Sequence, residues 1–184
     1  MFGSVSSIDH NLILTGYIGP GQVGIARRCA ERLRIPFIDF AARFEERVEM
    51  TADDVKAQYG DARLRSIESD LVAELVLARG TLIHISGQVL QYGERISAMG
   101  STGPIFCLVA TLDAVLTRLH VALGARYHNP KERSLALGSL RREWEIRSHP
   151  GIQEIDATGL DDAALIETLT QRWRSLTGVI DWRG

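Results

Sequence analysis

Short apolar runs alternate along this chain with longer segments whose apolar residues recur at helical spacing. Apolar runs bounded by glycine or polar turns are typical of buried strands. They predict strands at residues 12–15, 35–40, 81–85, 105–110 and 153–156. Spacings of three and four residues predict helices at 25–33, 64–78, 94–99, 112–123, 140–147 and 163–176, and one or two short helices within 44–59 with Thr51 as an N-cap.

Buried strands that alternate with amphipathic helices predict an α/β fold, a three-layer α/β/α sandwich with a mostly parallel sheet. The length of 184 residues fits a single domain over residues 1–184. Residues 124–138 are polar and contain Pro130, which predicts a mobile segment or a candidate lid.

Charge and composition restrict the function. The net charge of −2 and the pI of about 6.2 give no electrostatic reason to expect a nucleic-acid partner. The chain has no apolar run long enough to span a membrane and no basic-then-apolar start, so we expect a cytoplasmic protein with no membrane partner. Cys29 and Cys107 lie in apolar segments and are expected as buried free thiols, and the scattered histidines predict no metal site.

A glycine-rich loop joins the first predicted strand to the first predicted helix. In such a unit the backbone N–H groups of the loop and of the helix N-terminus face an anion. Residues 16–23 read GYIGPGQV, against the phosphate-loop pattern GxxxxGK[ST]. The glycines fit, but Gln22 replaces the lysine and Val23 replaces the hydroxyl residue that holds magnesium. A simple tight turn is the alternative, which three glycines between a strand and a helix disfavour.

In the order of its motifs the chain resembles the shikimate kinase family from about residue 11 to residue 176. The matching stretches are the strand and loop at 14–23, the helix end at 30–33, FIDFA at 37–41, GDARLRSIE at 60–68, the SGQ turn at 86–88 and Arg118-Leu119. None of these motifs matches the family pattern completely. The resemblance implies a P-loop kinase-like fold.

The resemblance also implies roles for individual residues. Asp39 would order magnesium and the reacting hydroxyl if the protein is active, Arg65 would hold the substrate carboxylate, and Gly87 would remain from a substrate-side triple glycine. The second aspartate of the family is Ala41 here. Phosphate and nucleotide would contact Gly19, Pro20, Gly21, Gln22, Val23, Gly24 and Arg118.

Four of these positions have plainer interpretations. Asp39 could cap a loop, and Arg65 could pair with Glu68 or Asp61 on its own helix. Gln22 is expected to be a solvated residue at a helix start. His84, inside an apolar strand, is expected to be a core histidine with satisfied hydrogen bonds.

Phosphoryl transfer depends on positioning and on neutralising the charge of the transferred group. Without the loop lysine and the magnesium-binding hydroxyl, the sequence predicts a shikimate kinase-like protein with impaired or no catalysis. Its pocket would still take a nucleotide, a phosphate or a small carboxylate. ATP and Mg²⁺ belong only to a first alternative, a working small-molecule kinase with a rearranged phosphate site. A second alternative is a structural or regulatory partner protein.

Overall fold

One parallel five-stranded sheet organises residues 9–178, the part of the chain that the computed structural model describes. Its strands are β1 (Leu12–Gly16), β2 (Phe37–Asp39), β3 (Leu82–His84), β4 (Ile105–Val109) and β5 (Ile152–Asp156), in the order β2-β3-β1-β4-β5. All five strands expected from the apolar runs are present, and β2, β3 and β4 are shorter than their runs.

Side chains of the central strand divide between two cores, one on each face of the sheet. Leu12 and Leu14 of β1 belong to one apolar cluster, and Ile13 between them belongs to the other. Alternation of this kind follows from the two-residue period of a strand. Because β1 is fully buried on both faces, it reads as a continuous apolar run.

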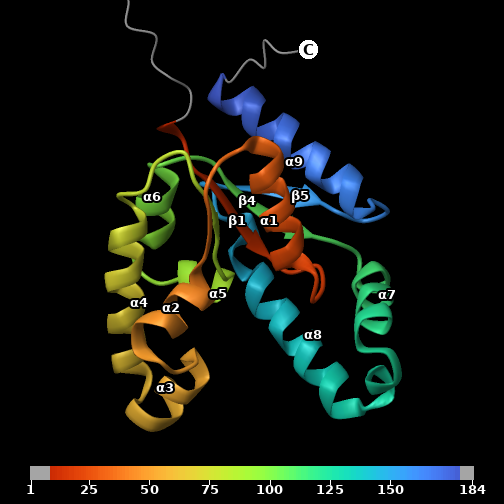
Figure 1. Ribbon diagram of the computed structural model, residues 1–184. Helices are drawn as coiled ribbons and strands as arrows, with labels where there is room; N and C mark the ends of the chain where they lie inside the picture. Colours follow the sequence, from red (N-terminus) through yellow and green to blue (C-terminus); the bar gives the residue numbers. More distant parts are fainter. Residues whose placement is uncertain (1–8, 179–184) are drawn as a thin grey trace, which may run out of the picture.

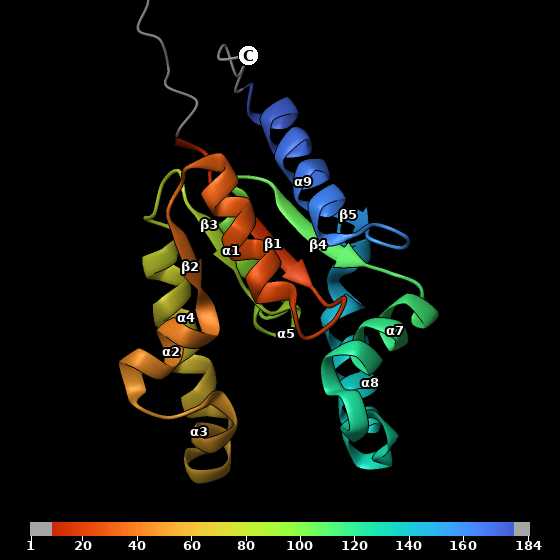
Figure 2. The same ribbon diagram turned by 45° about the vertical axis from the view of Figure 1, so that its right-hand side comes forward.

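Helices cover both faces, as the three-layer prediction requires (Figures 1 and 2). The cluster around Leu12 and Leu14 receives side chains from α1 (Gln22–Leu33), α7 (Leu112–Leu123), α8 (Pro130–Trp144) and α9 (Asp162–Thr177). The cluster around Ile13 receives side chains from α2 (Phe40–Val48), α3 (Ala52–Tyr59), α4 (Asp61–Leu75), α5 (Gly87–Leu90), α6 (Arg95–Gly100) and the 3₁₀ turn η3 (Glu145–Ser148).

The segment predicted within 44–59 forms two helices, α2 and α3. Thr51 caps α3 as expected, because its hydroxyl accepts a hydrogen bond from the Asp54 N–H at 3.1 Å. Asp39 caps α2 by accepting from the Ala42 N–H, also at 3.1 Å. The loop-capping interpretation of Asp39 is therefore correct in part.

Residues 124–138, the predicted mobile segment or lid, are helical. The 3₁₀ helix η2 (Gly124–His128) leads directly into α8, whose first turn begins at Pro130 and is capped by the Asn129 side chain. Proline is compatible with the first turn of a helix, where its missing N–H leaves no bond unmade. Only Leu140 and Glu143 of α8 are buried, so most of this helix lacks the apolar spacing from which the other helices were predicted.

Both cysteines are free and buried, as predicted. Burial raises the pKa of the Cys29 thiol to about 11. Burial, with Glu154 as the next cause, raises the pKa of the Cys107 thiol to about 12. Within residues 9–178, no helix is both long enough and apolar enough to cross a membrane.

Candidate functional site

A cavity of about 730 Å³ opens beyond the carboxyl ends of the strands. In doubly wound sheets this is the edge where ligands bind. Figure 2 shows α2 and α3 extending past the sheet on one side and α7 and α8 on the other. The described residues that line the cavity come from the ends of β1, β2 and β3, from the β1–α1 loop and the start of α1, from α2 to α5 with the segments that join them, from the residues after α5, and from α8. Of the predicted site residues they include Gly19, Pro20, Gln22, Val23, Asp39 and Arg65; Gly21, Gly24, Gly87 and Arg118 are not among them.

Gln22 occupies the inside of the glycine loop. Its Oε1 accepts the Ile18 N–H at 3.0 Å, and its Nε2 donates to the Gly16 carbonyl at 2.8 Å. Only 4% of Gln22 is exposed, so the expectation of a solvated residue was wrong. The carboxamide has one acceptor and one donor group, which match the two backbone groups across the turn. A loop N–H that could face a phosphate is thereby bonded within the chain.

Gly16 sets the shape of this turn. Its φ is +86°, and a Cβ placed on it would lie 2.3 Å from the Leu108 carbonyl oxygen on β4. Only glycine combines that backbone conformation with so close an approach. The turn therefore follows the neighbouring strand closely.

The Gln22 amide continues into a chain of hydrogen bonds through His84 and Asp39. Gln22 Nε2 lies 3.2 Å from His84 Nε2, and His84 Nδ1 lies 2.7 Å from Asp39 Oδ1. Because the backbone partners fix the orientation of the amide, its nitrogen can only donate, and His84 Nε2 must accept. The ring proton then sits on Nδ1 and is donated to Asp39. His84 is a satisfied histidine, as expected, but it lies on the cavity wall.

Asp39 is held in its ionised form. Burial raises the pKa of its carboxyl, but the hydrogen bond from His84, the hydrogen bond from the Ala42 N–H and the charge of Arg27 outweigh that effect and leave the pKa below its usual value. Both carboxylate oxygens have partners inside the chain, one on His84 and one on Ala42.

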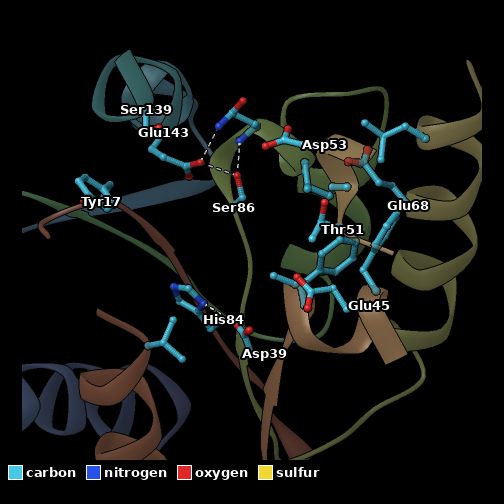
Figure 3. Close-up of a pocket in the computed structure, with 18 of the residues that line it drawn as sticks. Tyr17, Asp39, Glu45, Thr51, Asp53, Glu68, His84, Ser86, Ser139 and Glu143 are labelled. Carbon is cyan, nitrogen blue, oxygen red and sulfur yellow. Dashed lines mark hydrogen bonds and ion pairs between the residues drawn. The ribbon is translucent and has the colours of Figure 1, made fainter. Parts of the chain in front are cut away.

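Glu143 of α8 fills the turn that follows β3. Its carboxylate accepts the Ser86 hydroxyl at 2.5 Å, the Gly87 N–H at 2.5 Å and the Gln88 side-chain amide at 3.1 Å. Figure 3 shows Glu143 and Ser86 facing one another across this turn. A Cβ on Gly87 would lie 2.4 Å from the Glu143 carbonyl oxygen, so α8 packs directly on this glycine. The N–H at Gly87 thus bonds to a carboxylate of the protein itself.

The neighbouring Trp144 fixes the same end of α8 to the sheet. Its indole N–H is shared between the carbonyls of Tyr17, at 3.1 Å, and Leu108, at 3.0 Å. The carboxyl-terminal end of α8 is therefore bonded to the loop after β1 and to the turn after β3.

Arg118 contacts the glycine loop at Gly19, but its guanidinium group binds backbone carbonyls between β5 and α9. A Cβ on Gly19 would be 3.1 Å from the Arg118 Cβ, so the two residues are in contact. The guanidinium group donates to the Leu160 carbonyl at 2.9 Å and approaches the Ala157 carbonyl at 3.5 Å. In this geometry Arg118 joins α7 to the segment between β5 and α9.

The α3–α4 wall of the cavity carries the remaining charges. Glu68 forms a buried ion pair with Arg95 at 2.9 Å, and Lys56 pairs with Asp61 at 3.2 Å. The alternative in which Arg65 pairs with Glu68 or Asp61 is therefore wrong. Arg65 instead lies over the Tyr92 ring, 4.6 Å from its centre.

Sequence reasoning missed the place of Glu143 in this site and the hydrogen bonds of Trp144. Glu143 stands in a charged stretch near the end of a helix, where exposure is the ordinary expectation for a carboxylate. Within that stretch the buried Glu143 differs in no local feature from the exposed Glu145. Their partners are more than 30 residues distant in the chain, so only the fold brings them together.

The parallel sheet, the glycine loop between β1 and α1, and the helices on both faces define a P-loop kinase fold. Comparison supports this class: the shikimate kinase structure from Bacteroides thetaiotaomicron superposes with a TM-score of 0.72 at 24% identity, over 92% of this chain and 99% of that one. The structure of the Acinetobacter baumannii enzyme in complex with shikimate gives 0.67 at 17% identity, over 92% and 93%.

Sequence comparison identifies the family. The shikimate kinase family model matches residues 18–170. The chain is 25% identical over 170 residues to the shikimate kinase of Thermodesulfovibrio yellowstonii, covering 91% of this chain and 96% of that protein. It is 28% identical over 171 residues to that of Bacteroides fragilis, covering 90% and 94%. The chain belongs to the shikimate kinase family.

Proposed function

We propose that this protein is a shikimate kinase-like ligand-binding protein that transfers phosphate poorly or not at all. One observation carries the proposal: the Gln22 side chain bonds the Ile18 N–H and the Gly16 carbonyl and so fills its own glycine loop. A phosphate would have to displace that amide. The displaced amide would then leave Gly16 and His84 without their donor.

The loss of charged and metal-binding groups at the loop also supports weak or absent phosphoryl transfer. Removal of one charge-stabilising group commonly lowers the rate of an enzyme by about 10²–10³. A magnesium–nucleotide does not fit the side chains at the loop, because Val23 has no ligand atom and Asp39 is bonded to His84 and Ala42. Among the described residues, the only cations that line the cavity are Lys56 and Arg65, both on the α3–α4 wall.

The retained cavity favours a ligand-binding role over a purely structural one. A volume of about 730 Å³ is within the range of small-molecule sites. The solved relative from Acinetobacter baumannii is in complex with shikimate, so shikimate is the first ligand to test.

A coupled assay with ATP, magnesium and shikimate tests the proposal. We expect no turnover above the rate without protein, while an active shikimate kinase run in parallel reports its normal rate. Turnover of about 1 s⁻¹ or more, within the usual kinase range, would overturn the proposal and favour a working kinase with a rearranged phosphate site.

Thermal denaturation with added ligand tests whether the pocket is used. A ligand at about 100 times its dissociation constant adds about 2.7 kcal/mol to the free energy of unfolding. A rise in Tm with shikimate or phosphate, without turnover, is the expected signature of a pocket that binds without catalysis. The absence of any ligand effect in both assays would leave the structural-partner alternative.

A further inference from the structure

Two groups of helices extend past the sheet on either side of the cavity, and they carry opposite charges (Figure 2). The first, which we call the acidic arm, is residues 40–75, from α2 to α4. It contains nine acidic and five basic residues, a net charge of −4. The second, the basic arm, is residues 112–144, from α7 to α8. It contains three acidic and six basic residues, a net charge of +3.

Unpaired carboxylates gather at the end of the acidic arm, where α3 lies (Figures 1 and 2). Glu49 comes just before α3, and Asp53 and Asp54 stand in its first turn. All three are exposed, and the described residues provide no ion pair to any of them. The lysine of the same helix does not neutralise them, because Lys56 pairs with Asp61.

Unpaired cations stand in the same way at the end of the basic arm. Arg126 in η2 and Lys131 in the first turn of α8 are exposed and form no ion pair within residues 9–178. Apolar side chains are exposed beside these charges: Val121 is 81% and Leu135 is 71% accessible on the basic arm, and Tyr59 is 57% accessible on the acidic arm. Each arm therefore offers charge of one sign together with apolar surface that a protein partner can bury.

The two arms do not neutralise one another within one molecule. No ion pair joins residues 40–75 to residues 112–144 in the part of the chain that the structure describes. Each arm is fixed to the body of the protein instead, α4 by core side chains such as Leu71 and α8 by the hydrogen bonds of Glu143 and Trp144. Their charges are therefore available to another molecule.

We propose that two copies of this chain clasp one another, with the acidic arm of each on the basic arm of the other. A two-fold axis between the arms, perpendicular to the plane through them, turns a second molecule to face the first and exchanges the sides of its arms. Both contacts then form together, and once the first has formed the second is intramolecular. The two cavities face one another in this dimer, which does not depend on what they bind.

The charges favour a second copy over other partners. Nucleic acid is attracted by the basic arm but repelled by the acidic arm beside it. An unrelated acidic or basic protein uses one arm only. A second copy carries both complementary surfaces at the matching separation, because it carries the same two arms.

Sedimentation equilibrium of the full chain tests the proposal. We expect a dimer to form between about 1 µM and 1 mM protein at about 0.1 M salt, where charges act over about 10 Å. At about 1 M salt that distance falls to about 3 Å, and the dissociation constant should rise at least about tenfold. A monomer under all of these conditions, or a dimer that salt does not weaken, contradicts the proposal.

Charge reversal of one arm at a time locates the contact. Glu49→Lys combined with Asp53→Lys reverses the charge at the end of the acidic arm, and Arg126→Glu combined with Lys131→Glu does so for the basic arm. Every change is present at both contacts of the dimer, so each double variant should raise the dissociation constant at least about tenfold. A variant that associates as tightly as the wild type would place the interface elsewhere and refute the clasp.

Reversals outside the arms are the controls. Glu31 on α1 and Arg172 on α9 are exposed. Glu31→Lys and Arg172→Glu should leave the dissociation constant within about twofold of the wild type, because single exposed charges away from a contact contribute little. A loss of the dimer in these controls as well would show that net charge, and not the two arms, governs association.

A mixture of the two double variants separates the clasp from a failure to fold. In the mixed dimer the new lysines of one molecule face the new glutamates of the other, and at the second contact two unchanged arms meet. The equimolar mixture should therefore regain the dimer at the salt concentration at which neither variant alone forms it. A mixture as monomeric as its components, with both variants folded by circular dichroism, rules the arrangement out.

Discussion

Replacement of Gln22 by alanine tests whether its side chain supports the glycine loop. The change removes three contacts, to the Ile18 N–H, to the Gly16 carbonyl and to His84 Nε2. Each ordinary hydrogen bond contributes about 0.5–1.5 kcal/mol net, and a buried group left without a partner costs more. Because the site adjoins the cavity, water can enter and recover part of that loss.

We therefore expect Gln22→Ala to lower the free energy of unfolding by about 2–3 kcal/mol. For a chain of this length that corresponds to a fall in Tm of about 4–12 °C. Urea denaturation followed by tryptophan fluorescence measures the change. Val23→Ala is the matched control, because Val23 is 37% exposed and its substitution should stay within about 0.5 kcal/mol of the wild type. A Gln22→Ala protein as stable as this control would refute the role that we assign to the amide.

The same variant tests the competition between the amide and an anion. Once the carboxamide is gone, the Ile18 N–H and the other free N–H groups of the loop can face a phosphate. Phosphate should then raise the Tm of Gln22→Ala more than that of the wild type, with chloride at equal ionic strength as the reference. An equal response of both proteins would indicate that Gln22 does not exclude anions from the loop.

Three further predictions concern groups around the site and in the core. Glu143→Gln should cost about 1–3 kcal/mol in urea denaturation, because an amide cannot accept all three donors, whereas the exposed Glu145→Gln should change stability little. The pKa of Asp39 is lower in the folded protein than in the unfolded chain. Its carboxylate therefore stabilises the fold at any pH above the unfolded-state pKa, and this stabilisation is lost as the pH falls through the folded-state pKa. The Tm difference between the wild type and Asp39→Asn should therefore be full near pH 6 and shrink below about pH 4; a difference that grows on acidification would contradict this. Cys29 and Cys107 should resist iodoacetamide at pH 8 in the native protein and react in urea, which mass spectrometry of the labelled protein would measure.

Much of the fold could be predicted from the sequence because its strands are buried on both faces. A run such as LILTG carries the signal of a parallel strand by itself, and Thr51 marks a helix start by its side chain alone. The helix α8 was predicted only from residue 140 onward, although it begins at Pro130, and the reason is physical. A helix that lies at the rim of the fold, with few buried residues, lacks the apolar stripe from which helices are recognised.

The site was less accessible to sequence reasoning. The loss of the loop lysine and hydroxyl could be read directly at Gln22 and Val23, but the partners of Gln22 could not. Whether an amide at the start of a helix points to solvent or back into its own loop depends on His84, which the pairing of β1 with β3 brings beside it. Partners this far apart in the chain leave no local pattern.

Two backbone N–H groups beside the cavity, which could otherwise face an anion, are bonded in the same way to oxygen atoms of the chain. The side-chain oxygen of Gln22 accepts a hydrogen bond from the Ile18 N–H, and the Glu143 carboxylate accepts one from the Gly87 N–H. An internal group competes at an effective concentration set by the fold, which reaches the millimolar range even for flexible tethers and is higher when the group is held in place. An external phosphate or carboxylate must overcome that competition at both positions. On the α3–α4 wall, Arg65 contacts the Tyr92 ring and forms no ion pair within residues 9–178, so we expect a ligand of this protein to make its strongest polar contact there and not at the glycine loop.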